Sequence, residues 1–235
     1  MITVDFKSLP ITPHCRILDI GCGNGRHTAA AFDLNSGHVV GADPQFNDLK
    51  DAHDRMRFHE SLGPGGRWSL AGADITHLPF KETHFDIVLC AEVLEHIPDH
   101  KKAIAECARV LKKGGHLVVS VPRRWPEAIC WALSRKYRET QGGHLRIYSK
   151  RPLIDMIQSA GMRHWRSHYA HSLHAPFWWL KCLLGKNRDG LWPIRQYHRL
   201  LTWDIMHKPA VTRTLERILN PPMGKSVVLY FTKTA

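Results

Sequence analysis

Three glycines in alternate positions follow a short apolar stretch near the start of the chain. Residues 16–26 read RILDIGCGNGR, with Asp19 ahead of Gly21, Gly23 and Gly25. Glycine lets the backbone turn sharply and approach a ligand closely, and the helix expected next offers free N–H groups at its start. The dinucleotide pattern Gly-x-Gly-x-x-Gly does not fit this spacing. The segment therefore predicts a loop that binds a nucleotide-type cofactor other than a dinucleotide.

Further apolar segments end in residues that could contact the same ligand. Buried strands are expected over residues 38–43, 68–75, 85–90 and 116–122. Asp43 ends the first of them about 20 residues after the glycines, where doubly wound sheets place an acid on ribose hydroxyls. Asp74 and Ile75 end the next strand, and Cys90 and Glu92 lie at the end of the third. Ligands of such sheets bind beyond the carboxyl ends of the strands, so these residues are candidates for the binding site.

Together these motifs resemble the Rossmann-like class I S-adenosylmethionine-dependent methyltransferases, in particular the type 11 small-molecule methyltransferases. The resemblance implies S-adenosyl-L-methionine as the cofactor and methyl transfer to a small-molecule or lipid-like acceptor as the reaction. It also implies roles for single residues: Asp19, Gly21, Gly23 and Gly25 at the methionine end, Asp43 on the ribose, Asp74 and Ile75 beside the adenine, and Cys90, Ala91 and Glu92 bordering the methyl group.

Alternating strands and helices predict an α/β fold with a doubly wound, mostly parallel sheet. A helix from Ala105 is expected to end at a glycine C-cap in Gly114-Gly115, and a second helix to span residues 150–160 after an N-cap at Ser149. A sixth strand over 162–169 and a last one over 225–231 complete the pattern. By resemblance, the sheet has seven strands and the last strand is antiparallel.

The segment between the last two strands, residues 171–224, is far longer than an ordinary hairpin loop. Helices are expected over 175–186, 191–206 and 211–219, the last one ending at Asn220-Pro221-Pro222. The sixth strand is expected to run parallel to the first five strands. The insertion that follows it therefore emerges at the carboxyl-end edge of the sheet, where ligands bind. We therefore expect residues 1–235 to form a single methyltransferase domain in which 171–224 is a helical cap over the acceptor pocket.

Histidines are the candidate proton acceptors, because imidazole titrates near neutral pH and an acceptor hydroxyl or amine loses a proton during methylation. His144 lies in a His-x-Arg pattern that many relatives carry before a helix, although a structural hydrogen bond would explain it as well. His168 and His171 are candidates through their place at the end of the sixth strand.

Four histidines, at positions 164, 168, 171 and 174, have a spacing that could suggest a metal site. On a strand they cannot converge simply, and no carboxylate or cysteine of matching spacing accompanies them. The sequence therefore predicts no metal site.

Charge is distributed unevenly along the chain. Up to Pro122 there are 13 Lys and Arg against 15 Asp and Glu, and from Arg123 onward there are 20 against 6, a balance of +14. Seven of the eight tryptophans lie in this basic part, including Trp178 and Trp179 in an apolar segment that ends in lysine. Tryptophan with basic residues occurs in buried cores and also at membrane interfaces. An anionic membrane surface is therefore a candidate partner.

Methylation of a glycan or a soluble metabolite is an alternative that the sequence leaves open, whereas other classes of function fit less well. A nucleic-acid methyltransferase could use the basic part as a phosphate track, but no Asn/Asp-Pro-Pro-Tyr/Phe tetrapeptide, catalytic cysteine motif or RNA-binding module accompanies it. A scaffold protein would be expected to lose cofactor motifs, and none is lost. The six scattered cysteines and the lack of a long apolar stretch predict a cytoplasmic protein, with peripheral membrane association as an option. The sequence does not indicate an oligomeric state.

Overall fold

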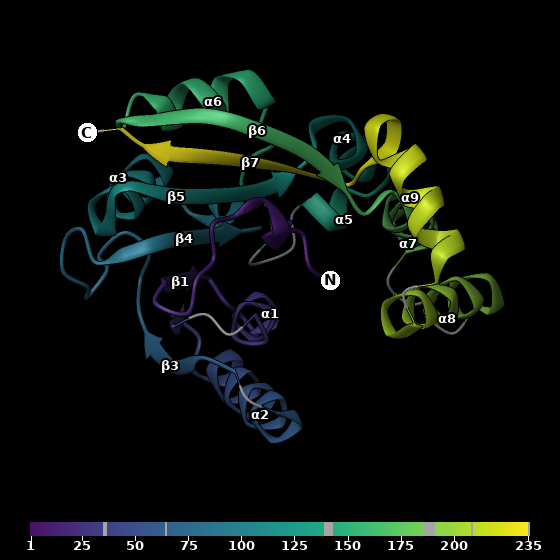
Figure 1. The fold of residues 1–235 in the computed structure, drawn as a ribbon. Coiled ribbons are helices and arrows are strands. Elements are labelled where there is room, and N and C mark those ends of the chain that lie inside the picture. Colours follow the sequence, from purple (N-terminus) through teal and green to yellow (C-terminus); the bar gives the residue numbers. More distant parts are fainter. Residues whose placement is uncertain (35–36, 64, 139–142, 186–190, 208, 235) are drawn as a thin grey trace.

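A computed structural model describes residues 1–34, 37–63, 65–138, 143–185, 191–207 and 209–234. Its centre is a seven-stranded sheet in the order β3-β2-β1-β4-β5-β7-β6 (Figure 1). The strands are β1 (Arg16–Ile20), β2 (His38–Asp43), β3 (Arg67–Gly72), β4 (Phe85–Ala91), β5 (Leu111–Pro122), β6 (Met162–Ala170) and β7 (Ser226–Lys233). The first five strands pair in parallel, and β7 is antiparallel to both β5 and β6. This confirms the predicted fold class.

Helices cover both faces of the sheet. Successive side chains on a strand point to opposite faces, so apolar side chains on both faces need to be covered. On β1, Leu18 and Ile20 belong to the core cluster that includes Ile104 of α3 and Leu153 of α6. Ile17 points the other way, into the cluster formed with α1 and α2. The helices are α1 (Arg26–Phe32), α2 (Phe46–Leu62), α3 (His100–Val110), α4 (Arg124–Leu133), α5 (Arg135–Arg138), α6 (Lys150–Gln158), α7 (Ala175–Leu184), α8 (Trp192–His207) and α9 (Ala210–Met223), with 3-10 turns η1 (Phe6–Ser8), η2 (Leu94–His96) and η3 (Ser172–His174).

Two predicted helix ends were wrong. α3 ends at Val110 without a glycine cap, because Leu111 is already extended and pairs with Phe85 of β4. Gly114 instead lies within β5, with a positive φ of 72°. α9 continues through Pro221 and Pro222, and its last turn is closed by a hydrogen bond from the Gly224 N–H to the Asn220 carbonyl (2.8 Å).

The three helices after β6 lie beyond the carboxyl ends of the parallel strands (Figure 1). α7 contacts α4, and α9 contacts the end of β6 and η3. The N-terminal segment reaches the same region, where the Thr3 N–H donates to His27 Nε2 at 3.1 Å. These elements surround the edge of the sheet where a ligand would bind. Among the described residues, no helix is long and apolar enough to span a bilayer.

Candidate functional site

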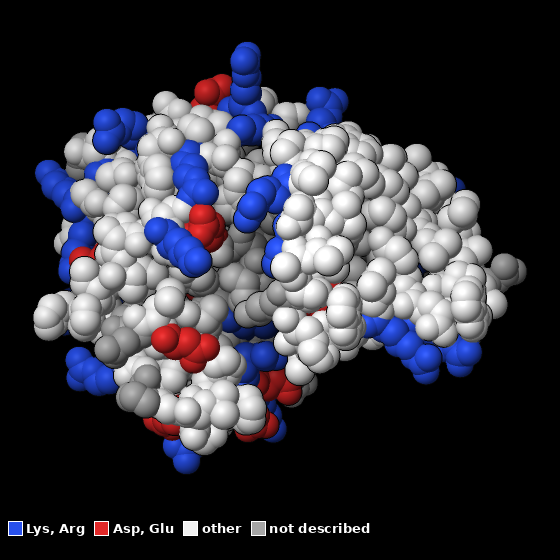
Figure 2. Space-filling model, turned by 45° about the vertical axis from the view of Figure 1, so that its right-hand side comes forward, with Lys and Arg blue, Asp and Glu red and all other residues white. Residues whose placement is uncertain are grey.

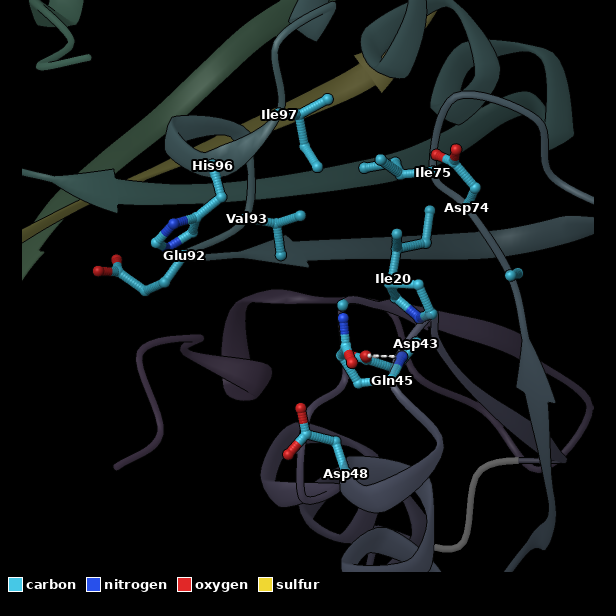
Figure 3. A pocket seen from close by; sticks show the side chains of 13 residues that line it. Ile20, Asp43, Gln45, Asp48, Asp74, Ile75, Glu92, Val93, His96 and Ile97 are labelled. Atoms are coloured by element: carbon cyan, nitrogen blue, oxygen red, sulfur yellow. Dashed lines mark hydrogen bonds between the residues drawn. The ribbon is translucent and has the colours of Figure 1, made fainter. Parts of the chain in front are cut away.

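A pocket of about 370 Å³ opens at the carboxyl ends of β1, β2 and β4 (Figure 3). It is lined by Ile20, Gly21, Asp43, Pro44, Gln45, Asp48, Ala73, Asp74, Ile75, Glu92, Val93, His96 and Ile97. Figure 3 shows Glu92 and His96 at one end of the pocket, Asp74 and Ile75 at the other, and Asp43 between them. An elongated ligand with distinct chemical groups at its two ends would fit this arrangement.

The glycine loop needs glycine for its backbone shape. Gly21, Gly23 and Gly25 all have left-handed φ angles, of 64°, 50° and 75°. A Cβ at Gly21 would lie 2.4 Å from Cγ2 of Val93, whereas a Cβ at Gly23 would meet no described atom within 4 Å. Gly21 therefore allows close packing against the segment after β4, and Gly23 leaves open space beside the pocket.

Asp43 ties the loop to the next strand. Its Oδ2 accepts a hydrogen bond from the Gly23 N–H at 2.9 Å, and its Oδ1 accepts one from the Gln45 N–H at the same distance. Each carboxylate oxygen has a second lone pair, so both can still accept from ligand hydroxyls. Asp43 therefore lies in the pocket with acceptors available, and its contact with a ribose stays a prediction.

Asp19 lies behind the loop and does not line the pocket. Its carboxylate accepts a hydrogen bond from Thr28 Oγ1 at 2.7 Å, which joins β1 to α1. Burial raises the pKa of Asp19 to about 6. Asp19 can therefore support the glycine loop and its helix, and it can act on a cofactor only across that loop.

The other predicted cofactor residues divide into two groups. Asp74 and Ile75 line the pocket, and the Asp74 side chain is fixed by a hydrogen bond from the Thr76 N–H at 2.8 Å. Glu92 also lines the pocket, has a positive φ of 60° and accepts a hydrogen bond from Ser120 Oγ at 3.0 Å. Cys90 is fully buried and is absent from the lining, and a hydrogen bond with the Cys107 thiol, together with burial, raises its pKa.

A histidine pair lies next to the Glu92 end of the pocket. The ring of His96, which lines the pocket, is 5.0 Å from the ring of His144 between centroids. His144 Nδ1 is 2.6 Å from Oε1 of Glu127 on α4, a carboxylate with 2% exposure. Burial alone would raise the pKa of Glu127, but the hydrogen bond and charge of His144 outweigh burial, and the pKa is lowered.

This arrangement suits general base chemistry, because a carboxylate on Nδ1 orients the imidazole and leaves Nε2 to take a proton. Sequence reasoning missed Glu127. No local pattern links it to His144, since the two residues meet only when α4 packs beside the loop before α6.

The two other histidine candidates lie elsewhere. His168 Nε2 is 3.2 Å from the Thr3 carbonyl, beneath the N-terminal segment. His171 follows β6 with a positive φ of 64°, and its ring is 5.5 Å from that of His174. None of the three predicted histidines, His144, His168 and His171, is among the residues that line the pocket; His144 reaches it only through its contact with His96.

Comparison with known proteins identifies the class. Residues 18–119 match the family described as "Methyltransferase domain". The ubiquinone biosynthesis O-methyltransferase of Hahella chejuensis is 37% identical over 122 residues, covering 52% of this chain and 49% of that protein. The methyltransferase GfsG of Streptomyces halstedii is 35% identical over 115 residues, covering 49% and 40%. The 27-O-demethylrifamycin SV methyltransferase of Amycolatopsis mediterranei is 34% identical over 111 residues, covering 47% and 40%. These matches span less than half the length of each relative.

Solved structures share the fold over nearly the whole chain. The YcgJ protein of Bacillus subtilis superposes with a TM-score of 0.63 at 21% identity, covering 98% of this chain and 96% of that one. The [4+2]-cyclase SpnF gives the same TM-score at 18% identity, covering 98% and 78%. At these identities the likeness shows the fold alone, and the cyclase is a reminder that a fold does not decide a reaction.

The fold and the pocket therefore define the class I S-adenosylmethionine-dependent architecture. Residues 18–119 match the model of the type 11 methyltransferase domain, in agreement with the resemblance of the sequence motifs. The cofactor of this class is S-adenosyl-L-methionine. The residues present fit it, since the loop at Gly23 leaves open space and the carboxylates of Asp43, Asp74 and Glu92 line the pocket.

Proposed function

We propose that the protein binds S-adenosyl-L-methionine in this pocket and methylates a hydroxyl group of a small-molecule or lipid-like acceptor. The observation that carries the proposal is the pocket itself, in which a left-handed glycine loop is held by Asp43 and faces Glu92 and His96. The choice of a hydroxyl acceptor follows from relatives named as O-methyltransferases and from the histidine with a buried carboxylate beside the pocket.

The residues have separate roles in this proposal. When bound, the cofactor supplies a methyl group already activated on a sulfonium. Asp43 holds the ribose, Asp74 and Ile75 the adenine, and Glu92 the end near the methyl group. With the cofactor and acceptor bound, His144 Nε2 would take the proton that the acceptor hydroxyl loses on methylation, and Glu127 would hold the ring in position.

Calorimetric titration with S-adenosylhomocysteine is the direct test. We expect one site per chain and competition by S-adenosylmethionine. The proposal would be wrong if the protein gives no heat of binding and its thermal unfolding is unchanged by a large excess of either compound.

We also propose that the helices after β6 form a cap on the acceptor side and that the acceptor is met at an anionic lipid surface. The expected membrane contact at Trp178 and Trp179 is not favoured by their packing. Both side chains are partly buried. Trp178 packs in a small apolar cluster with Phe177, and Trp179 Nε1 donates a hydrogen bond to the Pro126 carbonyl at 3.0 Å. The core alternative suits these two tryptophans better.

The exposed apolar side chains lie on the next two helices instead. On α9, residues 211, 215 and 218 fall on one helical face and are 77%, 41% and 64% exposed, while Thr212 and Glu216 are buried. On α8 the exposed apolar residues include Trp192, Trp203 and Met206. Figure 2 shows this part of the molecule as a surface dominated by uncharged residues with Lys and Arg at its border. Such a surface fits the headgroup region of an anionic bilayer.

A further inference from the structure

Side chains from two distant parts of the insertion meet where β6 ends. His171 follows the strand, His174 lies in η3, and Glu216 lies on the inner face of α9. Each side chain offers one nitrogen or oxygen atom as a ligand, and these three atoms lie within 4.8 Å of one another. This cluster lies outside the cofactor pocket.

The cluster is buried and its hydrogen bonding is incomplete. His174 is 6% exposed and Glu216 is 7% exposed. His171 Nε2, His174 Nδ1 and Glu216 Oε1 are inaccessible and have no hydrogen-bond partner among the described residues. Buried polar atoms without partners are rare and costly, so three in one place indicate a missing ligand.

The second oxygen of the carboxylate is engaged elsewhere. Glu216 Oε2 forms an ion pair with Arg213, whose Nη1 lies 2.9 Å away. Arg213 also pairs with Asp204 of α8. The guanidinium is therefore balanced by two carboxylates and fixes the orientation of Glu216, with Oε1 left without a partner.

The protonation of the two imidazoles is also suitable. Burial lowers the pKa of His174 to about 4 and also lowers the pKa of His171. Burial thus favours the neutral imidazole, the form in which histidine binds metals, and it also raises the pKa of Glu216, so metal binding would release a proton from any Glu216 that is protonated.

We propose that His171, His174 and Glu216 bind a divalent metal ion of the zinc type, which links the end of β6 to α9. Two imidazoles and one carboxylate are a known zinc ligand set, with water as a fourth ligand. Zinc ligands at 2.0–2.1 Å lie about 3.3 Å apart in a tetrahedron, so modest side-chain rotations would close the site. Sequence spacing did not show it, because the carboxylate comes from a helix far along the chain.

Metal titration of the full chain, stripped with a chelator, tests the site without an activity assay. One equivalent of Co²⁺ should give the visible absorption bands of a four-coordinate site with nitrogen and oxygen ligands. Zn²⁺ should displace the Co²⁺ and raise the melting temperature of the protein. Glu216→Gln and His174→Ala should each weaken metal binding by at least about tenfold. Mutation of residues that only orient the metal ligands already lowers metal affinity by this factor.

Two further variants serve as comparisons. His164→Ala removes another buried histidine nitrogen without a partner, on β6 and outside the cluster, and should leave metal affinity unchanged. His96→Ala tests a second group, Glu95, His96 and His144, whose atoms also approach within 4.8 Å.

Absence of binding by the wild type would overturn the proposal. So would binding that survives Glu216→Gln but is lost in His96→Ala. If His174→Ala does not fold, Glu216→Gln decides, because glutamine keeps the size of the side chain and its contact with Arg213.

Discussion

Asp43 is held in place before any ligand arrives. Two backbone N–H groups, from Gly23 and Gln45, each donate to one of its oxygens at 2.9 Å. Fixed acceptors lose little freedom when a ligand binds, so the free energy of each new hydrogen bond is largely retained. The same holds for Asp74, whose pKa is lowered first of all by the hydrogen bond from the Thr76 N–H.

Replacing Asp43 should therefore weaken cofactor binding. Asp43→Asn keeps the size of the side chain but loses the charge and one acceptor oxygen. Hydrogen bonds to charged groups contribute about 1.5–3 kcal/mol, so the affinity for S-adenosylhomocysteine should fall by roughly 10- to 100-fold. Calorimetry measures this, with Asp51→Asn on α2 as the matched control outside the pocket lining. Equal affinities of the two variants would count against the ribose contact.

The His144 and Glu127 pair predicts a loss of rate without a loss of cofactor. His144→Ala should lower turnover by about 10²–10⁴-fold with a small phenolic test acceptor. Glu127→Gln should slow the reaction less and change its pH profile, because an amide cannot hold the imidazolium that forms. Chromatography of S-adenosylhomocysteine gives the rate and calorimetry gives the affinity. An unchanged rate in His144→Ala would leave only its structural role.

Asp19 carries a pH prediction. Burial raises the pKa of Asp19 from the usual 3.8 to about 6. The folded state therefore favours the protonated carboxyl group. The free energy of unfolding falls as the pH rises from about 4 through 6. Asp19→Asn keeps an acceptor for Thr28 and removes the titration. Between pH 4 and 7 the wild type should lose up to about 3 kcal/mol relative to this variant. Urea unfolding at the two pH values checks the sign, and parallel profiles would contradict it.

At the scale of elements, periodicity predicted most strands and helices well. Apolar runs such as 38–43 became strands because a parallel sheet buries both faces. The end of α3 was predicted wrongly because Leu111 joins the sheet before the glycines are reached, and pairing with β4 outweighs a local cap signal. Partners such as Glu127 for His144 could not be predicted from one sequence, since they depend on how helices pack.

α9 is the element whose sequence and environment conflict most. Its apolar stripe, which includes Val211 and Ile218, faces outward, while Glu216 faces the interior. Burial of an apolar side chain contributes about 1.5–3 kcal/mol, so this stripe could supply much of a reversible membrane attachment.

We therefore expect Val211→Ser combined with Ile218→Ser to reduce sedimentation with liposomes containing phosphatidylglycerol by about tenfold or more. Phe58→Ser is the matched control, because this α2 residue is 61% exposed but lies far from the insertion in sequence. Thermal unfolding of both variants should remain close to that of the wild type. If the double variant sediments as the wild type does, the stripe is not the contact.

At the scale of the whole molecule, the two halves differ in charge. The part up to Pro122, which carries the cofactor motifs, has 13 basic against 15 acidic residues, whereas the part that contains the insertion has 20 against 6. In the proposed association with lipid, the strongly basic part would attract the molecule to an anionic surface from a distance, and short-range apolar contacts would then hold it there. The same field would orient the insertion toward the surface, with the cofactor half facing away.

This asymmetry predicts a binding step that depends on salt and on anionic lipid. Each Lys or Arg near an anionic bilayer contributes about 1 kcal/mol, and the Debye length falls from about 30 Å at 0.01 M salt to about 3 Å at 1 M. Liposomes with phosphatidylglycerol should therefore sediment the protein at low salt and release most of it at high salt, whereas phosphatidylcholine alone should retain little. Retention on both lipids at every salt concentration would mean that apolar contact acts alone. A protein that stays in the supernatant at low salt would direct the search toward a water-soluble acceptor.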